Sequence, residues 1–523
     1  MAKYLTKRIL YSIFCVIAVV AIVMIMIYSL LDRNKVFAND SQYSKLSNNQ
    51  RTIYCYQQWE SYGYLDYVPY TDWLNAMAAA GEIDEETRSA AASIGRTAEN
   101  DSETVAAYVA EFTEYYESQG YTVVRLDAVV AGKKLASGGS QTLFATKDIP
   151  LASRILSYFT GLFEFDNIHK VTDDVGERGL TFTLYDPVYG GEKFSPAIIG
   201  NGTNHKYLLY FDNVFPYIHQ NFMNLNLGIS YSVNSGIDVW QTMTQKQGSF
   251  AMRTVIYETG LTESSADNLH TATYVSNSRT ATVVNEARYV DNYTNVSTYS
   301  AGLSKVGYSF CIGIVATILA YVLGLPLGVL MARYKDGLLD KIGTVYIIFI
   351  IAVPSLAYIF LFKAIGGSVF HLPTTFNMES TSKLYYVLPI ISLALPSVGS
   401  LMKWMRRYMI DQMNADYVKF ARSGGLSETE IFSKHIMKNA AIPIIHGIPG
   451  SVLGALTGAI ITERVYVVPG AGNLLTTAIN AYDNGVIVGV TLFYAVLTVT
   501  SIILGDLLMS MVDPRISFTT KAR

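Results

Sequence analysis

Six long segments without a charged side chain constrain the fold of this 523-residue chain more than any other feature. Each segment has 18 to 26 residues, and about 20 residues of α-helix cross a hydrocarbon layer about 30 Å thick. One such segment could be the core helix of a soluble domain, but six of them predict an α-helical polytopic membrane protein with six transmembrane helices. The segments are Ile9–Leu31, Val306–Met331, Ile342–Phe362, Leu384–Met402, Ile444–Ile461 and Val486–Leu504.

The first segment has to be distinguished from a secretory signal peptide. Lys3, Lys7 and Arg8 precede or begin it, and Val36-Phe37-Ala38 resembles a cleavage site. The apolar part of a signal peptide has about 7–15 residues, whereas this segment has 23. We therefore expect a retained membrane anchor in residues 1–31.

Charge divides the chain into two parts. Residues 32–304 carry 19 Lys and Arg against 31 Asp and Glu, whereas the rest carries 20 against 11. If the N-terminus is cytoplasmic, the cytoplasmic tails and loops hold 16 basic residues and the two short outer loops hold three, in agreement with the positive-inside rule. This predicts cytoplasmic N- and C-termini and an external segment 32–304. The asymmetry then reflects two compartments rather than a nucleic-acid partner.

The external segment is long enough for one or two folded domains, and we expect an inserted α+β domain. Ser102 and the amphipathic stretch after it predict a capped helix that ends near Gly120, and Trp73–Ala92 is also expected to be helical. Three further segments have the composition of strands, namely Tyr121–Val130, Leu180–Tyr185 and Thr271–Val290.

No pattern in the sequence indicates catalysis or metal binding. The three cysteines stand apart, so that neither a disulfide framework nor a CxxC site can be built from them. The histidines of the external segment are scattered, and no Ser/His/Asp arrangement has usable spacing. The phosphate-binding motif GxxxxGK[ST] is also missing from the sequence. We expect a chain that is not an enzyme, binds no cofactor or metal and does not itself hydrolyse ATP.

The predicted cytoplasmic loop 403–443 carries the most specific pattern. A first short helix is expected to end at Gly424-Gly425, because glycine readily adopts the left-handed conformation after a helix. Ser427 and Glu430 have the spacing of a capping box that starts a second helix. One face of that helix carries Ile431, Phe432, His435, Ile436 and Ala440. Such a face can fit a groove of a partner protein or lie on lipid, and the residues alone leave both open.

This loop resembles the EAA loop of ABC-importer permeases, in the form found in the dipeptide and oligopeptide family. In that form a run like D-Y-V-x-x-A-R-x-x-G-L-S precedes H-x-x-x-N-A and a proline. The matching residues are Asp416, Tyr417, Val418, Ala421, Arg422, Gly425, Leu426, Ser427, His435, Asn439, Ala440 and Pro443. Gly424 departs from the family, which often has lysine there. Further matches are Leu325–Gly328, Asp340, Val353-Pro354-Ser355, Arg406-Arg407, Glu463 and Asp513-Pro514-Arg515.

The resemblance implies the type I ABC-importer permease fold, with an anchor helix in 1–31, the insertion 32–304 and a five-helix core in 305–523. It also implies a bacterial plasma membrane protein that carries peptides. The implied partners are a second homologous permease, two cytoplasmic ATPase subunits that hold ATP and Mg²⁺, and an extracellular peptide-binding protein. The residues expected to couple the chain to an ATPase are Ala421, Gly425, Leu426, Ser427, Glu430, Ile431, Phe432, His435, Asn439 and Pro443. Leu426, Ile431 and Phe432 are expected to form the anchor buried in that partner.

Two other functions are weighed against this interpretation. A proton-coupled or facilitative transporter with an external sensor domain would need no ATPase, and its proton-coupled form predicts carboxylates in the middle of helices. A membrane-anchored adhesion or assembly protein would not need the 416–443 element. The few ionisable residues of the apolar segments lie near their ends. Lys363 and Glu463 are expected to reach water at external helix ends, and Asp506 is expected to pair or face water.

Overall fold

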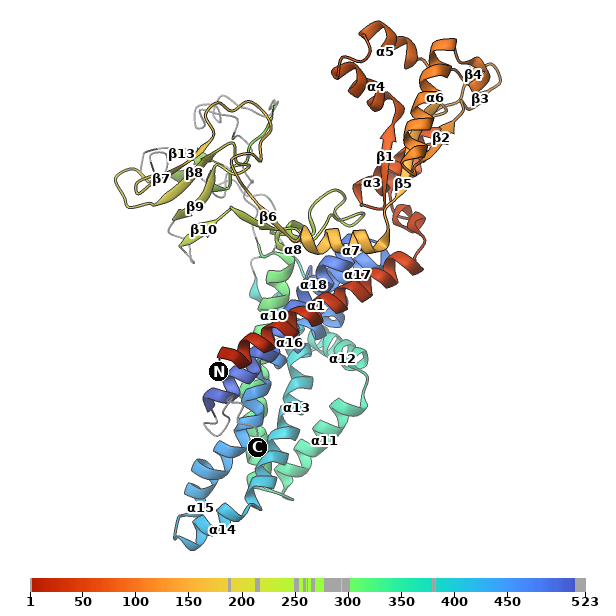
Figure 1. Ribbon diagram of the computed structural model, residues 1–523. Helices are drawn as coiled ribbons and strands as arrows, with labels where there is room; N and C mark the ends of the chain where they lie inside the picture. Colours follow the sequence, from red (N-terminus) through yellow and green to blue (C-terminus); the bar gives the residue numbers. More distant parts are fainter. Residues whose placement is uncertain are drawn as a thin grey trace.

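The computed structural model describes residues 2–512 except 187–189, 212–216, 249–253, 257–259, 261, 265–268, 277–292, 294–301, 379 and 381. Figure 1 shows an elongated molecule, with helices in one part and two lobes of the insertion at one end. We call this the insertion end. We call the opposite end, where α14 (Asp416–Ser423) and α15 (Glu428–Glu430) lie, the loop end. Most of the predicted strand Thr271–Val290, and the segment Asp513-Pro514-Arg515, fall outside the described residues.

Within the described residues, five helices are long and apolar enough to cross a membrane. They are α1 (Ala2–Leu30), α10 (Lys305–Arg333), α13 (Val387–Met413), α16 (Met437–Tyr466) and α18 (Asn484–Val512). Each overlaps one of the predicted segments, which confirms a polytopic helical membrane protein. A short helix, α17 (Ala471–Asn480), connects α16 to α18 at the insertion end.

The remaining predicted segment is divided by a sharp bend. It forms α11 (Leu338–Ala352) and α12 (Ser355–Ser368), whose axes differ by 114°. Pro354 has no N–H group and confines the preceding Val353 to extended backbone, so α11 ends there and a new helix starts after the proline. The expectation of one helix over Ile342–Phe362 is therefore wrong, and the predicted total of six spans holds only if this bent pair crosses as one.

Small residues bring α10 and α13 close together. A Cβ atom on Gly324 would lie 3.1 Å from the Val398 carbonyl oxygen, and one on Gly328 would lie 2.9 Å from that of Met402. Because membrane helices gain little from burying apolar surface, they associate through such close packing. α16 contacts both α10 and α13, and α1 packs on α18.

The first lobe of the insertion follows α1. Its antiparallel sheet has the order β1-β5-β2, from β1 (Leu65–Pro69), β5 (Thr142–Asp148) and β2 (Thr122–Leu126). The helices of this lobe are α2 (Ser41–Lys45), α3 (Asn48–Ser61), α4 (Tyr70–Ala79), α5 (Glu85–Ala91) and α6 (Glu103–Ser118). The predicted cap of α6 is confirmed, because the Ser102 hydroxyl accepts a hydrogen bond from the Val105 N–H at 3.2 Å. The predicted helix over Trp73–Ala92 is divided into α4 and α5 by a turn at Gly81, whose φ is +77°.

The second lobe contains a four-stranded antiparallel sheet of order β10-β9-β8-β7. Its strands are β7 (Gly179–Thr183), β8 (Ala197–Asn201), β9 (Tyr207–Phe211) and β10 (Ile218–Gln220). The predicted strand Leu180–Tyr185 corresponds to β7. A pair of short strands, β6 (Phe163–Phe165) and β11 (Met223–Leu225), lies between this lobe and the helices. The insertion therefore forms two lobes with separate sheets rather than one continuous α+β unit.

A buried carboxylate attaches the insertion to the helices. Asp483, between α17 and α18, is fully buried and accepts a hydrogen bond from the Ser230 hydroxyl at 2.6 Å. It also accepts bonds from the backbone N–H groups of 231–233 and of Val486, at 2.9 to 3.1 Å. No motif in the sequence points to Asp483, because most of its partners lie about 250 residues earlier in the chain.

Candidate coupling loop and groove

The connection between α13 and α16 is shorter than the predicted loop 403–443. α13 continues to Met413 and α16 begins at Met437, so that residues 414–436 connect them at the loop end (Figure 1). The connection contains α14, a glycine turn, α15 and a π-helical turn, η5 (Ile431–Ile436), that runs directly into α16. The helix–glycine–helix arrangement is confirmed. The sequence does not predict the π-helical turn. Such turns are rare in proteins, but those that occur are often at functional sites.

Gly425 forms the turn between α14 and α15. Its φ is +83°, a conformation that favours glycine, whereas Gly424 has an ordinary φ of −75°. A Cβ atom on Gly425 would meet no atom within 4 Å. The turn therefore needs glycine for its backbone conformation and not for space.

Ser427 caps the helix that follows the turn. Its hydroxyl accepts a hydrogen bond from the Glu430 N–H at 3.3 Å, which is one half of the predicted capping box. The Glu430 carboxylate accepts a bond from Lys434 Nζ at 2.7 Å. Arg422 and Glu428 form an exposed ion pair across the turn. Exposed pairs of this kind add little stability, so the shape of the loop depends mainly on its apolar contacts.

The side of the loop that faces the helices is apolar. Ile431 and Ile436 on η5 are buried, Ile431 completely. They belong to one hydrophobic cluster with Val418 of α14 and with Met405 and Met409 of α13. Ile431 is predicted from the sequence as part of an anchor for a partner protein, and the structure corrects this assignment. Its side chain is already covered by this chain and holds the loop to α13.

The opposite side of the loop exposes two apolar side chains. Phe420 on α14 is 80% exposed, and Leu426 at the turn is 37% exposed. Leu426 is among the predicted coupling residues, whereas Phe420 was missed. The sequence does contain a signal for it, because residues two positions apart in a helix lie about 200° apart around its axis. Once Val418 is placed inside, Phe420 must point outward.

The other predicted coupling residues lie between these two sides. Phe432 is half-buried, and the Arg333 guanidinium at the end of α10 lies 5.4 Å from the centre of its ring. Ala421, His435 and Asn439 are also half-buried. Pro443 lies inside α16 and lines the groove described below.

A buried ion pair joins α11 to α13 near the loop. Asp340, in the first turn of α11, is 3% exposed. It accepts hydrogen bonds from Nε and Nη2 of Arg406 on α13, the latter at 2.7 Å. The Asp336 N–H donates a third bond at 3.0 Å. The start of α11 is therefore fixed to the helix that leads into the loop.

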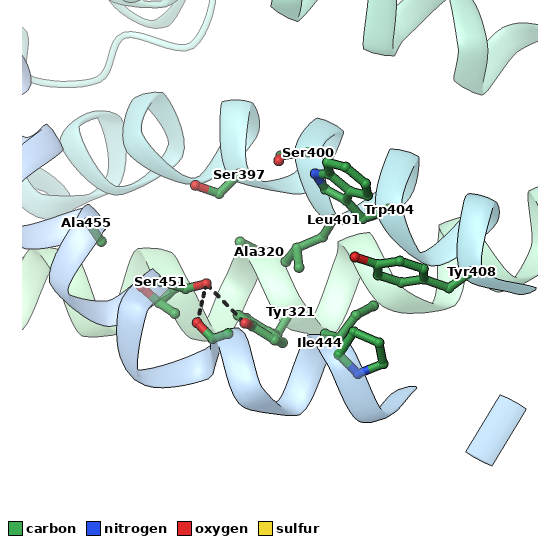
Figure 2. A pocket seen from close by; sticks show the side chains of 14 residues that line it. Ala320, Tyr321, Ser397, Ser400, Leu401, Trp404, Tyr408, Ile444, Ser451 and Ala455 are labelled. Carbon is green, nitrogen blue, oxygen red and sulfur yellow. Dashed lines mark hydrogen bonds between the residues drawn. The ribbon is translucent and has the colours of Figure 1, made fainter. Parts of the chain in front are cut away.

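A groove of about 450 Å³ lies among α10, α13 and α16 (Figure 2). The hydroxyl oxygens of Tyr321 and Ser451 are 3.0 Å apart across it, and Ser451 donates to the Gly447 carbonyl at 3.0 Å. Its polar lining residues are Thr317, Tyr321, Ser397, Ser400, Trp404, Tyr408 and Ser451. None of the 14 lining residues, all of them in the described part of the chain, carries a charge. The groove can hydrogen-bond a polar ligand without selecting for its charge.

Glu463 and Lys363, predicted to reach water at helix ends, point into the protein instead. Glu463 is fully buried, the Ser309 hydroxyl donates to its Oε1, and the Asn473 N–H donates to its Oε2 at 2.9 Å. Lys363 Nζ donates to the Val465 carbonyl at 2.7 Å. The expectation that Glu463 extends to water is therefore wrong, whereas Lys363 is only half-buried. Their contacts join α10, α12, α16 and α17 at the insertion end.

Asp506 pairs with Arg8 on α1 at 3.2 Å, one of the two outcomes expected for it. Among the residues that the structure describes, no group of three or more His, Cys, Asp or Glu side chains could hold a metal ion. The described helices thus place their buried carboxylates near the ends of the spans and not along the groove.

Comparisons with known proteins agree with this architecture. Residues 324–518 match the family described as "Binding-protein-dependent transport system inner membrane component". The chain is 34% identical over 536 aligned residues to the "Oligopeptide transport system permease protein AmiC" of Streptococcus pneumoniae, covering all of this chain and 99% of that protein. It is 32% identical to the "Dipeptide transport system permease protein DppB" of Lactococcus lactis, over 43% of this chain and 73% of DppB. A Bacillus subtilis DppB gives 32% identity over 41% of this chain and 68% of that protein.

The helical core, the loop and these matches define a membrane permease subunit of the ABC-importer class, which is a transport protein. Because the similarity to AmiC extends over the insertion as well as the core, this chain belongs to the family of oligopeptide transport permeases. The comparisons favour this interpretation over a proton-coupled transporter.

Proposed function

We propose that this chain forms half of the translocation path of an ATP-driven oligopeptide importer and receives the ATP-driven movement through residues 416–443. The observation that carries the proposal is the 34% identity to the oligopeptide permease AmiC over the whole chain. A second homologous permease would complete the path. Two cytoplasmic ATPase subunits would hold ATP and Mg²⁺, and this chain would bind neither. An extracellular peptide-binding protein would deliver the peptide, with the insertion as its docking platform or funnel.

The two sides of the loop suit it to this role. Ile431 and its neighbours are continuous with the hydrophobic cluster of α13 and α16, so a displacement of the loop moves these helices. Phe420 and Leu426 point away from that cluster and are free to fill a cleft of an ATPase subunit. ATP binding can shift the transporter between states only through contacts that differ between them, and these two side chains would make such contacts.

The groove suits a substrate of variable sequence. Peptides share a backbone of N–H and C=O groups but differ in side chains and charge. Hydroxyl groups such as those of Ser397, Ser400 and Tyr408 can bond the shared backbone, and the uncharged lining neither attracts nor repels one sign of side chain. We therefore assign to this groove the half of the peptide path that this chain contributes.

The orientation in a bacterial plasma membrane follows from the same proposal. The loop end would face the cytoplasm, where the ATPase subunits bind, and both termini would lie there. The insertion end would face outward, so that residues 32–304 would lie outside the cell. The excess of basic residues in the loop and tails supports this orientation.

Exchanging the exposed apolar residues of the loop for aspartate tests the coupling role. Phe420→Asp and Leu426→Asp should abolish copurification of the ATPase subunits and peptide-stimulated ATP hydrolysis by the reconstituted transporter. Both side chains are exposed, so the unfolding temperature of the isolated permease should stay unchanged. If both variants kept copurification and peptide-stimulated hydrolysis, the loop would not be the coupling element.

Phe194→Asp is the matched control. Phe194 lies in the insertion and is 62% exposed, so this exchange adds the same charge at the opposite end of the molecule. It should leave ATPase copurification intact. Loss of copurification in Phe194→Asp as well would show a general effect of an added charge rather than a contact of the loop.

A further inference from the structure

A cleft of about 330 Å³ at the insertion end belongs neither to the loop nor to the groove. Met24 and Tyr28, near the end of α1, and Val488, near the start of α18, line it from the helices. α7 (Leu151–Thr160) and the segment 226–231 line it from the insertion. Because α1 and α18 are predicted membrane spans that end or begin within about two turns of these residues, the cleft lies at the level of the lipid headgroups.

Arg154 on α7 lines this cleft, and its guanidinium contacts two aromatic rings that are perpendicular to each other, at 87°. The guanidinium carbon lies 3.8 Å from the centre of the Tyr28 ring and 3.9 Å from that of Tyr64. The Arg154 side chain also hydrogen-bonds that of Tyr64. A guanidinium has five N–H groups, so others remain that can match the oxygens of a phosphate. Within the described part of the chain, no Asp or Glu lies within ion-pair distance of Arg154.

A second polar group at this cleft lacks a hydrogen-bond partner among the described residues. The Tyr158 hydroxyl, on the same helix as Arg154, is buried and makes no hydrogen bond to any residue in the described ranges. Buried hydroxyls in folded proteins nearly always have a partner. The hydroxyl groups of Ser61 and Ser157 line the cleft as well. Arg154 has no carboxylate partner among the described residues, and Tyr158 on the same helix has an unpartnered hydroxyl. Together they favour a ligand with an anionic group rich in oxygen.

We propose that this cleft binds the phosphate headgroup of an anionic phospholipid, with Arg154 and Tyr158 as the residues that hold the phosphate. The acyl chains would lie along α1, where Ile22, Ile25 and Met26 are 46 to 55% exposed. A peptide on its way through the membrane is not expected here, since α1 packs on α18 while the groove lies among α10, α13 and α16.

Native mass spectrometry of the complete transporter in detergent, titrated with phosphatidylglycerol, tests this site. Arg154→Gln should weaken phosphatidylglycerol binding by at least about tenfold, because it removes a charge-assisted hydrogen bond. Tyr158→Phe should weaken it by about threefold, the loss of one neutral hydrogen bond. Arg154→Lys keeps the charge but loses the planar arrangement of N–H groups. Its affinity for phosphatidylglycerol should therefore lie between those of Arg154→Gln and the unchanged protein.

Arg33→Gln is the matched control, because the Arg33 guanidinium also lies over an aromatic ring, that of Trp59 at 4.3 Å, but is paired with Asp148 at 2.9 Å. Phosphatidylglycerol binding should be unchanged in this variant. Equal binding by Arg154→Gln and the unchanged protein would overturn the proposal, leaving Arg154 as a structural link between α7 and α1. Displacement of the lipid by inorganic phosphate or by a peptide would overturn the assignment to lipid.

Discussion

The insertion and the loop 414–436 are attached to the helical part by different kinds of contact, although a buried ion pair, Asp340 with Arg406, lies near the loop. At the insertion end, the buried carboxylates of Asp483 and Glu463 accept hydrogen bonds from hydroxyl and backbone N–H groups. At the loop end, apolar side chains such as Ile431 are buried, and the charged pair of Arg422 and Glu428 is exposed. Hydrogen bonds are directional and hold one geometry, whereas apolar contact is non-directional. The insertion is thus fixed in position, while the loop can shift together with the helices.

Removing the carboxylate of Asp483 should have the largest effect. Asp483→Ala removes the acceptor of four backbone N–H groups, two buried and two partly buried, and of one buried hydroxyl. We expect the free energy of unfolding to fall by on the order of 4 kcal/mol, measured by thermal unfolding of the purified permease. Asp148→Ala, which removes a carboxylate that is 74% exposed, should cause no measurable change. Similar unfolding temperatures for the two variants would contradict the distinction between the two ends.

At the loop end, the loss of a buried apolar side chain should lower the stability of the permease. Ile431→Ala creates a cavity in a fully buried position and should reduce the free energy of unfolding by about 3 kcal/mol. Phe420→Ala, at an 80% exposed position, should leave stability unchanged and weaken only association with the ATPase subunits. Thermal unfolding and ATPase copurification measure the two effects separately. The inside–outside assignment would fail if Phe420→Ala destabilised the permease and Ile431→Ala did not.

A buried ion pair of the insertion should make its stability depend on pH. Hydrogen bonds from the Arg125 guanidinium lower the pKa of the Asp101 carboxyl, whose side chain is 4% exposed. Because the folded-state pKa lies below the unfolded value, the pair contributes fully above about pH 4. Its contribution is lost as the pH falls through the folded-state pKa. Asp101→Asn should lower the free energy of unfolding by about 2 kcal/mol at neutral pH. In thermal unfolding, this variant should also lose less stability on acidification than the unchanged protein. If Asp101→Asn lost as much stability on acidification as the unchanged protein, the ion pair would not be the source of the pH dependence.

The exposed pair of the loop should have the smallest effect. Glu428→Gln removes the carboxylate that pairs with Arg422, and the two side chains are 69% and 56% exposed. Solvent screens such a pair, so the unfolding temperature should not change measurably, and added salt should make no difference. A decrease in unfolding temperature as large as that of Asp101→Asn would mean that this exposed charged pair also holds the loop.

Local features of the loop could be predicted from the sequence alone. Gly425 and Ser427 act on their immediate neighbours, so their spacing was enough to predict the turn and the cap. It was harder to predict which apolar residue of the loop is buried and which is exposed, because Ile431 and Phe420 have similar hydrophobicity. Only the position of α13 decides that one is buried and the other exposed.

The sequence by itself determined where five of the described membrane spans lie and that the insertion follows the first of them, because hydrophobic length and charge are properties of short segments. Tertiary structure alone decided how the insertion is attached, since Asp483 and Ser230 meet across 253 positions of the chain. It also turned Glu463 inward and brought Arg154 beside Tyr28 and Tyr64. Composition cannot encode such contacts, because each depends on two distant segments reaching the same place in space.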